Sequence, residues 1–204
     1  ALTPDDALRV ALERAEPDII VANNWRTKLP RSIYGLPPHG TLNLHDSLLP
    51  RFTGFSPVIW SLISGAAETG LTAHRMDDEL DTGDIVVQRS VPIGPRDTAT
   101  QLVQATIDLI PEVLLEALTA LESGTAVWTP QDLSQRTFFH KRADIDSRID
   151  WTWPAEDIDR LVRAQSDPYP NAWTHYRGRR LRIVEAHVSQ GIYGGTPGRV
   201  FIHE

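Results

Sequence analysis

The feature that most constrains the fold is a short, continuously apolar segment, residues 19–22, which lies between Pro17-Asp18 and the pair Asn23-Asn24. A short strand without polar alternation is typical of a parallel sheet that is covered on both faces. Pro17 ends the helix expected before it. The segment therefore predicts an α/β architecture, with the loop of residues 23–25 at the carboxyl end of a buried strand.

The next predicted strand, residues 41–45, alternates strictly between apolar and polar side chains. Leu42 and Leu44 share one face, and Asn43 and His45 share the other. In open α/β sheets ligands bind beyond the carboxyl ends of the strands, so an amide and an imidazole presented there could hold a carbonyl oxygen. An ordinary role as hydrogen-bonded sheet residues explains such a short pair more often.

Two further strands are predicted at residues 71–76 and 85–91, joined by an acidic loop at residues 77–84 that contains Asp81. A solvated turn explains most loops of this kind. The spacing of an EF-hand calcium loop is absent, and strands rather than helices flank the loop. His74, on the first of these strands, is interpreted as a structural residue.

The remainder predicts a short helix at about 57–64 and a long one from about 98 to 123, which Pro111 should kink or split. Residues 125–150 are polar and irregular. A helix at about 154–165 and short strands at 172–176, 181–188 and 198–202 follow. We therefore expect a catalytic domain at residues 1–124, a linker at 125–150 and a partial β domain at 151–204.

Composition narrows the class of protein. The chain has 204 residues and no cysteine, so it can form neither a disulfide nor a cysteine-based metal site. We find no apolar run long enough for a membrane span and no signal peptide, and we expect a cytoplasmic protein. The net charge of −7 does not favour a polyanionic partner, although the basic hairpin at residues 177–182 could contact phosphates.

Several spaced motifs occur together in one register. They are Asn43-Leu44-His45, Ser47-Leu48-Leu49-Pro50 and, at the end of the acidic loop, Asp81-Thr82-Gly83. This pattern resembles the folate-dependent formyltransferase family, which includes methionyl-tRNA formyltransferase, glycinamide ribonucleotide transformylase, nucleotide-sugar N-formyltransferases and the hydrolase domain of formyltetrahydrofolate dehydrogenase. Residues 149–173 resemble the junction with the C-terminal domain of the methionyl-tRNA and nucleotide-sugar branches.

The resemblance implies a Rossmann-like, mostly parallel sheet followed by the start of a small, OB-like β-barrel domain. It also implies an internal portion of a longer protein, without its first βα units and the end of its C-terminal domain. The implied formyl donor is N10-formyltetrahydrofolate, and no metal is required. Asn43 and protonated His45 would donate hydrogen bonds to the developing oxyanion, and Asp81 would pair with His45 and accept the amine proton.

Folate recognition in this family relies largely on the backbone of two loops. By position, the residues implied here are Trp25, Thr27, Lys28, Leu29, Met76, Asp77, Asp78 and Glu79. Residues after Pro50 depart from the family pattern, with Thr53 where arginine is common and Phe55-Ser56 where small residues are usual. These departures favour a small-molecule amine as acceptor, such as an amino-sugar nucleotide or an amino-acid-like metabolite. Methionyl-tRNA, hydrolysis to formate, a folate-binding module without turnover and a homodimer remain open.

Overall fold

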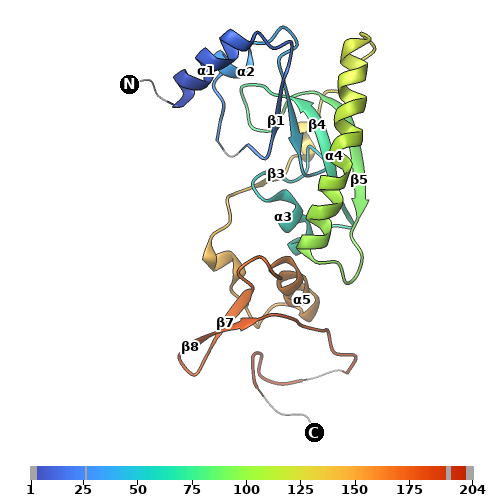
Figure 1. The fold of residues 1–204 in the computed structure, drawn as a ribbon. Coiled ribbons are helices and arrows are strands. Elements are labelled where there is room, and N and C mark those ends of the chain that lie inside the picture. Colours follow the sequence, from blue (N-terminus) through green and yellow to red (C-terminus); the bar gives the residue numbers. More distant parts are fainter. Residues whose placement is uncertain (1–3, 26, 192–193, 201–204) are drawn as a thin grey trace.

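The computed structural model describes residues 4–25, 27–191 and 194–200. A four-stranded sheet with a long helix across one face forms its upper part, and a helix and a hairpin form its lower part (Figure 1). The elements of the upper part are α1 (Pro4–Ala15), β1 (Ile20–Asn23), α2 (Arg31–Tyr34), β2 (Thr41–His45), β3 (Thr53–Gly54), α3 (Pro57–Ile63), β4 (Glu68–Arg75), β5 (Ile85–Pro92) and α4 (Ala99–Glu122). The later elements are the 3-10 helices Leu133–Gln135 and Asp144–Ser147, β6 (Phe138–Phe139), α5 (Ala155–Ala164), β7 (Ala172–Tyr176) and β8 (Arg179–Ile183).

The sheet has the strand order β1-β2-β4-β5. β1 and β2 pair in parallel, as the apolar segment predicts, but β1 is an edge strand of this sheet and Val21 is 38% exposed, so it is not covered on both faces. Within this four-stranded sheet, β2 with β4 and β4 with β5 pair antiparallel. The short acidic loop between β4 and β5 accounts for the last pair, because a parallel connection needs a much longer crossover.

Helix α4 covers one face of the sheet and determines which face is free. Leu42 and Leu44 of β2 pack in one apolar cluster with Val113 and Ala117 of α4. Strict alternation then directs Asn43 and His45 to the opposite face, as predicted. The helix continues through Pro111 as a single element of 24 residues, so the predicted split does not occur. Before Pro111, Ala99 and Leu102 pack in a cluster with α3, and after it Val113 and Ala117 pack on the sheet.

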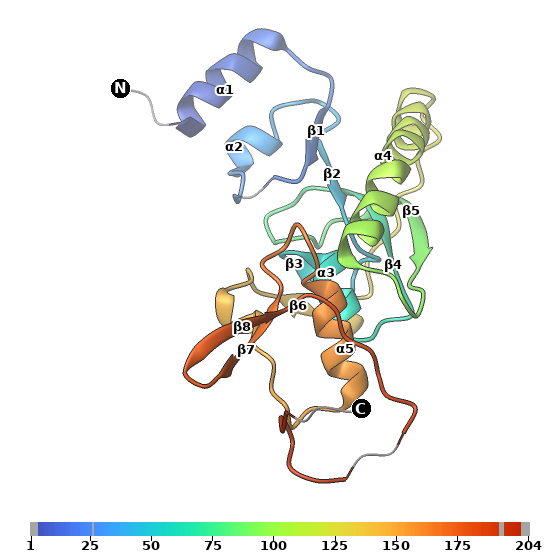
Figure 2. The same ribbon diagram turned by 60° about the horizontal axis from the view of Figure 1, so that its bottom comes forward.

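The connection at residues 125–150 contains regular structure. Its strand β6 pairs in parallel with β3, which lies in the loop that follows β2. Helix α5 packs against α3 through Leu62 and Ala164, and the two helices lie side by side below the sheet (Figure 2). The domain boundaries of the sequence analysis stay predictions.

The tail forms the predicted hairpin of β7 and β8, with Arg177-Gly178 at the turn. β8 ends at Ile183, earlier than predicted, and residues 198–200 form no strand. Positions 201 and 202 of the third predicted strand lie outside the described residues. In the described part of the chain the tail is a hairpin and not a closed barrel.

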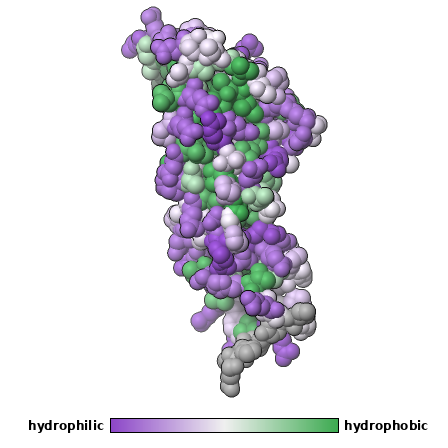
Figure 3. Space-filling model, turned by 90° about the vertical axis from the view of Figure 1, so that its right-hand side faces the viewer, coloured by the Kyte–Doolittle hydropathy of each residue, from purple (hydrophilic) through white to green (hydrophobic). Residues whose placement is uncertain are grey.

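The surface on the side of α4 and β5 carries hydrophobic patches among hydrophilic side chains (Figure 3). Ile107 and Leu115 of α4 are among the exposed apolar residues. In the described portion of the molecule, no helix has the length and apolar character that crossing a bilayer requires.

Candidate active site

Asn43, His45 and Asp81 come together at the carboxyl end of β2. Asp81 lies in the loop between β4 and β5, and its Oδ1 is 3.7 Å from His45 Nδ1. His45 and Asp81 are each 7% exposed. The distance is too long for a direct hydrogen bond, so the contact is an electrostatic one, made when the ring is protonated. The structure therefore brings these three sequence-predicted residues to one place.

The main chain of the loop after β2 orients the ring of His45. His45 Nε2 lies 2.9 Å from the carbonyl oxygen of Phe52. A carbonyl oxygen can only accept, so Nε2 carries a proton and donates it to Phe52. The other ring nitrogen, Nδ1, faces Asp81. The main chain thus occupies Nε2, and Nδ1 is the ring nitrogen that faces the carboxylate.

Two hydrogen bonds hold Asp81, and a third holds Gly83 in the same loop. Asp81 Oδ2 accepts a hydrogen bond from the main-chain N–H of Gly54 at 2.8 Å. The side-chain amide of Gln131 donates to the carbonyl oxygens of Asp81 and Gly83 at 3.0 and 2.7 Å. Asp81 has a φ of 58°, a left-handed conformation that aspartate tolerates better than most residues. The carboxylate of Asp81 is therefore held by the loop after β2, and its main chain is held by the segment after α4.

At Gly83 the main chain of the acidic loop passes too close to the end of β4 to leave room for a side chain. A Cβ atom at this position would lie 1.9 Å from the carbonyl oxygen of Arg75. The loop therefore passes directly over the end of β4, which only a residue without a side chain allows. This close approach turns the chain back toward β2 and places Asp81 beside His45.

A second histidine belongs to the same cluster. His74 Nε2 is 3.0 Å from Asn43 Nδ2 and 3.9 Å from Asp81 Oδ1. Burial, followed by the proximity of His45, lowers the pKa of His74 from 6.5 to about 4. The sequence analysis treated His74 as a structural residue. Its position opposite Asn43 follows from the antiparallel register of β2 and β4, which single-strand patterns do not reveal.

The segment between α4 and α5 connects the two loops of the site. Thr137 accepts a hydrogen bond from Phe52 N through its hydroxyl, and its carbonyl accepts one from Thr53 N. Arg136 Nη2 donates to the carbonyl oxygen of Leu80, 2.9 Å away. Together with Gln131, these residues join the His45 side of the site to the Asp81 side. No motif in the sequence identified them.

The two loops that the family resemblance assigns to the folate also meet. Met76 packs on the cluster of Leu29, Ile33 and Tyr34. Asp78 accepts hydrogen bonds from Tyr34 and, at 3.5 Å, from Arg31. The other residues assigned to this loop pair are exposed or bonded within their own loop: Trp25, Thr27, Lys28, Asp77 and Glu79. Arg26 lies outside the described residues.

The segments that carry these loops are held by charge as well as by packing. Tyr34 has a pKa raised above 10, chiefly because its hydroxyl donates to Asp78. Glu79 pairs with Arg136 at 3.7 Å.

Among the described residues no group of three or more histidine, aspartate and glutamate side chains could hold a metal ion. The prediction that no metal takes part stays a prediction.

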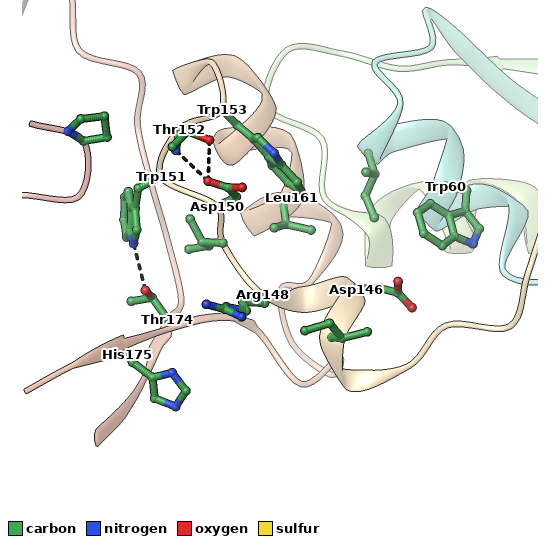
Figure 4. A pocket seen from close by; sticks show the side chains of 14 residues that line it. Trp60, Asp146, Arg148, Asp150, Trp151, Thr152, Trp153, Leu161, Thr174 and His175 are labelled. Carbon is green, nitrogen blue, oxygen red and sulfur yellow. Dashed lines mark hydrogen bonds between the residues drawn. The ribbon is translucent and has the colours of Figure 1, made fainter. Parts of the chain in front are cut away.

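A separate cavity of about 730 Å³ lies lower in the molecule, between α3, α5 and β7 (Figure 4). Trp60, Trp151 and Trp153 contribute to its wall. Trp151 donates to Thr174 Oγ1 at 2.9 Å. None of Asn43, His45 and Asp81 lines this cavity, so it is distinct from the candidate active site.

The carboxyl end of β2 thus gathers a half-buried amide, two buried imidazoles and a buried carboxylate, at the edge of the sheet where open α/β folds bind their ligands. Residues 2–118 match the family model described as formyl transferase, and residues 143–204 match the formyl transferase C-terminal domain. This chain belongs to the formyl transferase family.

Curated relatives and solved structures agree with this assignment. The chain is 39% identical over 196 residues to a methionyl-tRNA formyltransferase of Anaeromyxobacter dehalogenans, covering 95% of this chain and 62% of the relative. It is 35% identical to one of Nitrosomonas europaea, covering 89% of this chain and 56% of that protein. HypX from Aquifex aeolicus, in complex with tetrahydrofolic acid, is 25% identical with a TM-score of 0.77, over 96% of this chain and 34% of HypX. The chain thus spans less than two thirds of the curated relatives' length.

Proposed function

We propose that this chain forms the catalytic part of an enzyme that transfers a formyl group from N10-formyltetrahydrofolate to an amine. The observation that carries the proposal is the buried contact between His45 Nδ1 and Asp81 Oδ1, with Asn43 on the same sheet face. This arrangement offers hydrogen-bond donors to a carbonyl oxygen and an acceptor for the proton of an attacking amine.

Each residue has a separate task in this proposal. The Asn43 NH₂ group and the Nδ1–H of protonated His45 donate to the carbonyl oxygen on which negative charge develops. Loss of one such donor costs roughly 3–4 kcal/mol of transition-state stabilisation. Asp81 pairs with the charged ring and accepts the proton that the amine loses; an equivalent proton goes to N10 of the folate as its bond to the formyl carbon breaks. The Phe52 carbonyl keeps the ring turned so that Nδ1, and not Nε2, meets the substrate.

The loops around Leu29 and Met76 suit a flat heterocycle. Their apolar contact and the exposed ring of Trp25 provide surfaces for stacking, and the loop main chain provides hydrogen-bonding groups. The formyl-folate, when bound, supplies the activated one-carbon group. We assign its binding to Trp25, Thr27, Lys28, Leu29, Met76, Asp77, Asp78 and Glu79.

The acceptor that we favour is a small-molecule amine, such as an amino-sugar nucleotide or an amino-acid-like metabolite. The net charge of −7 disfavours a polyanionic acceptor. Thr53 also supports this choice, since it stands where the family often has arginine, and its buried hydroxyl is bonded to the Thr137 carbonyl and to Arg136 Nε. The guanidinium of Arg136 also donates to the Leu80 carbonyl, so the arginine beside Thr53 already has partners within the protein.

Methionyl-tRNA is the second candidate, and the names of the curated relatives favour it. The test is an assay of the full-length protein with N10-formyltetrahydrofolate and a panel of small amines, beside methionyl-tRNA. Transfer to an amine of the panel with no salt-sensitive tRNA binding supports our choice. Formylation of methionyl-tRNA alone contradicts the small-molecule acceptor, and release of formate without an acceptor indicates a hydrolase.

A further inference from the structure

His74 and Asn43 face each other across the antiparallel pair of β4 and β2. His74 Nε2 and Asn43 Nδ2 are 3.0 Å apart. The pairing of β4 with β5 shifts its register between Ala73 and His74. That shift lies on the other edge of β4, whereas the register of β4 with β2 is regular from Leu42 to His45. His74 is therefore placed against a residue of the proposed oxyanion site by regular antiparallel pairing.

The neighbours of His74 determine which of its nitrogens carries the proton. His74 Nδ1 lies 2.9 Å from the main-chain carbonyl oxygen of Arg75. A carbonyl oxygen accepts only, so Nδ1 is the protonated nitrogen. The ring is 2% exposed, and burial together with nearby His45 lowers its pKa to about 4. The ring is thus neutral near pH 7, and Nε2 presents a lone pair toward Asn43.

A lone pair on Nε2 leaves Asn43 with one favourable orientation. The amide must turn its NH₂ group toward His74, because its carbonyl oxygen would meet the lone pair and gain no hydrogen bond. One N–H of the amide is then used by His74, and the second remains for a substrate oxygen. With the opposite orientation, Asn43 would offer an acceptor where the proposed reaction needs a donor.

We propose that His74 is a positioning residue, which as a neutral acceptor holds the Asn43 amide with its NH₂ group ready for the carbonyl oxygen of the formyl donor. The inference rests on the proposed function and deepens it. If His74 only filled space, replacing it would lower the rate of formyl transfer by the same factor whether or not Asn43 is present. The experiment uses this difference.

The main test is a double-mutant cycle in the full-length protein, with formyl transfer as the measured rate. His74→Leu removes the acceptor, and His74→Gln keeps an acceptor oxygen near the position of Nε2. We expect His74→Leu to lower kcat about tenfold or more with little change in KM for the formyl-folate, and His74→Gln to stay within about threefold of wild type. In an Asn43→Ala background, His74→Leu should cost less than about twofold.

Independent losses that multiply in the double variant would overturn the proposal, and so would equal losses in His74→Leu and His74→Gln. If Asn43→Ala itself left formyl transfer unchanged, the proposed function would fail instead, which keeps the two failures distinct. Imidazole ¹⁵N chemical shifts of the wild-type protein give a second test that needs no variant. They should show His74 protonated at Nδ1 alone near pH 7, and a ring protonated at Nε2 would refute the proposal.

Discussion

The carboxylate of Asp81 faces the ring of His45 at a distance of 3.7 Å, from a loop that the chain reaches only after α3 and β4. The contact is not made by neighbouring strands alone. It also depends on the close approach of Gly83 to the end of β4 and on the hydrogen bond that Gln131 donates to the Asp81 carbonyl. The position of Asp81 thus depends on Gly83 and Gln131, and buried His74 lies beside it.

Gln131 should position Asp81 without touching a substrate. Gln131→Leu removes two hydrogen bonds to the carbonyl oxygens of Asp81 and Gly83. Leaving buried carbonyl groups unpaired costs about 1–3 kcal/mol, and the loosened loop should lower kcat on the order of tenfold. Steady-state kinetics of the full-length protein measure this. Gln135→Leu, in the same segment but bonded to exposed Asp132, is the matched control and should remain close to wild type.

Gly83 should tolerate no side chain. In Gly83→Ala the new Cβ would lie 1.9 Å from the Arg75 carbonyl oxygen, so the loop or the end of β4 must move. Overpacking of this kind costs typically about 1–3 kcal/mol. We expect a lower free energy of unfolding in urea together with weakened formyl transfer. Gly194→Ala, where a Cβ would meet no atom within 4 Å, should change neither quantity. Equal behaviour of the two variants would contradict the close passage.

His74 should make stability depend on pH. Its folded pKa of about 4 lies below the ordinary 6.5, so the unfolded chain binds more protons between these values. Stability is therefore complete above about pH 6.5 and falls as the pH drops toward 4, by on the order of 3 kcal/mol. His45, Asp81 and Asp77 act on the same ring, and the two carboxylates oppose the shift.

The check is the free energy of unfolding of wild type and of His74→Gln across this pH range. Glutamine does not titrate, so the variant should lose the part of the slope that belongs to His74. His39→Gln, at an exposed loop position, serves as the control and should retain the wild-type slope. Identical slopes in wild type and His74→Gln would mean that His74 is not held neutral by burial.

Local patterns predicted the main strands and helices and two residues of the candidate site. The alternation in residues 41–45 placed Asn43 and His45 on one face, because a strand has a period of two and Leu42 and Leu44 need a core. The Asp81-Thr82-Gly83 motif could be connected with them only through the family resemblance. The role of Gly83 in that motif, a close approach to Arg75, depends on tertiary structure that no local pattern encodes.

The remaining contacts of the candidate site could not be predicted from the sequence, because they depend on pairing between distant segments. His74 faces Asn43 because β2 and β4 pair antiparallel in this register. Gln131, in the segment that follows α4 in the sequence, donates to Asp81. The polar composition of residues 125–150 indicated a linker, yet Thr137 and Arg136 bond to both loops of the site. Hydrogen bonds of single side chains to a distant main chain leave no periodic signal.

The most direct test of the account is the rate of formyl transfer by Asp81→Asn in the full-length protein. A single-turnover assay with N10-formyltetrahydrofolate and the accepted amine separates the chemical step from binding. Asp84→Asn, in the same acidic loop, is the matched control, and His45→Ala completes the set. We predict that Asp81→Asn and His45→Ala each slow transfer by about 100-fold or more with folate affinity little changed, while Asp84→Asn stays near wild type. Transfer at the wild-type rate in Asp81→Asn would contradict the central claim that the His45–Asp81 contact drives the reaction.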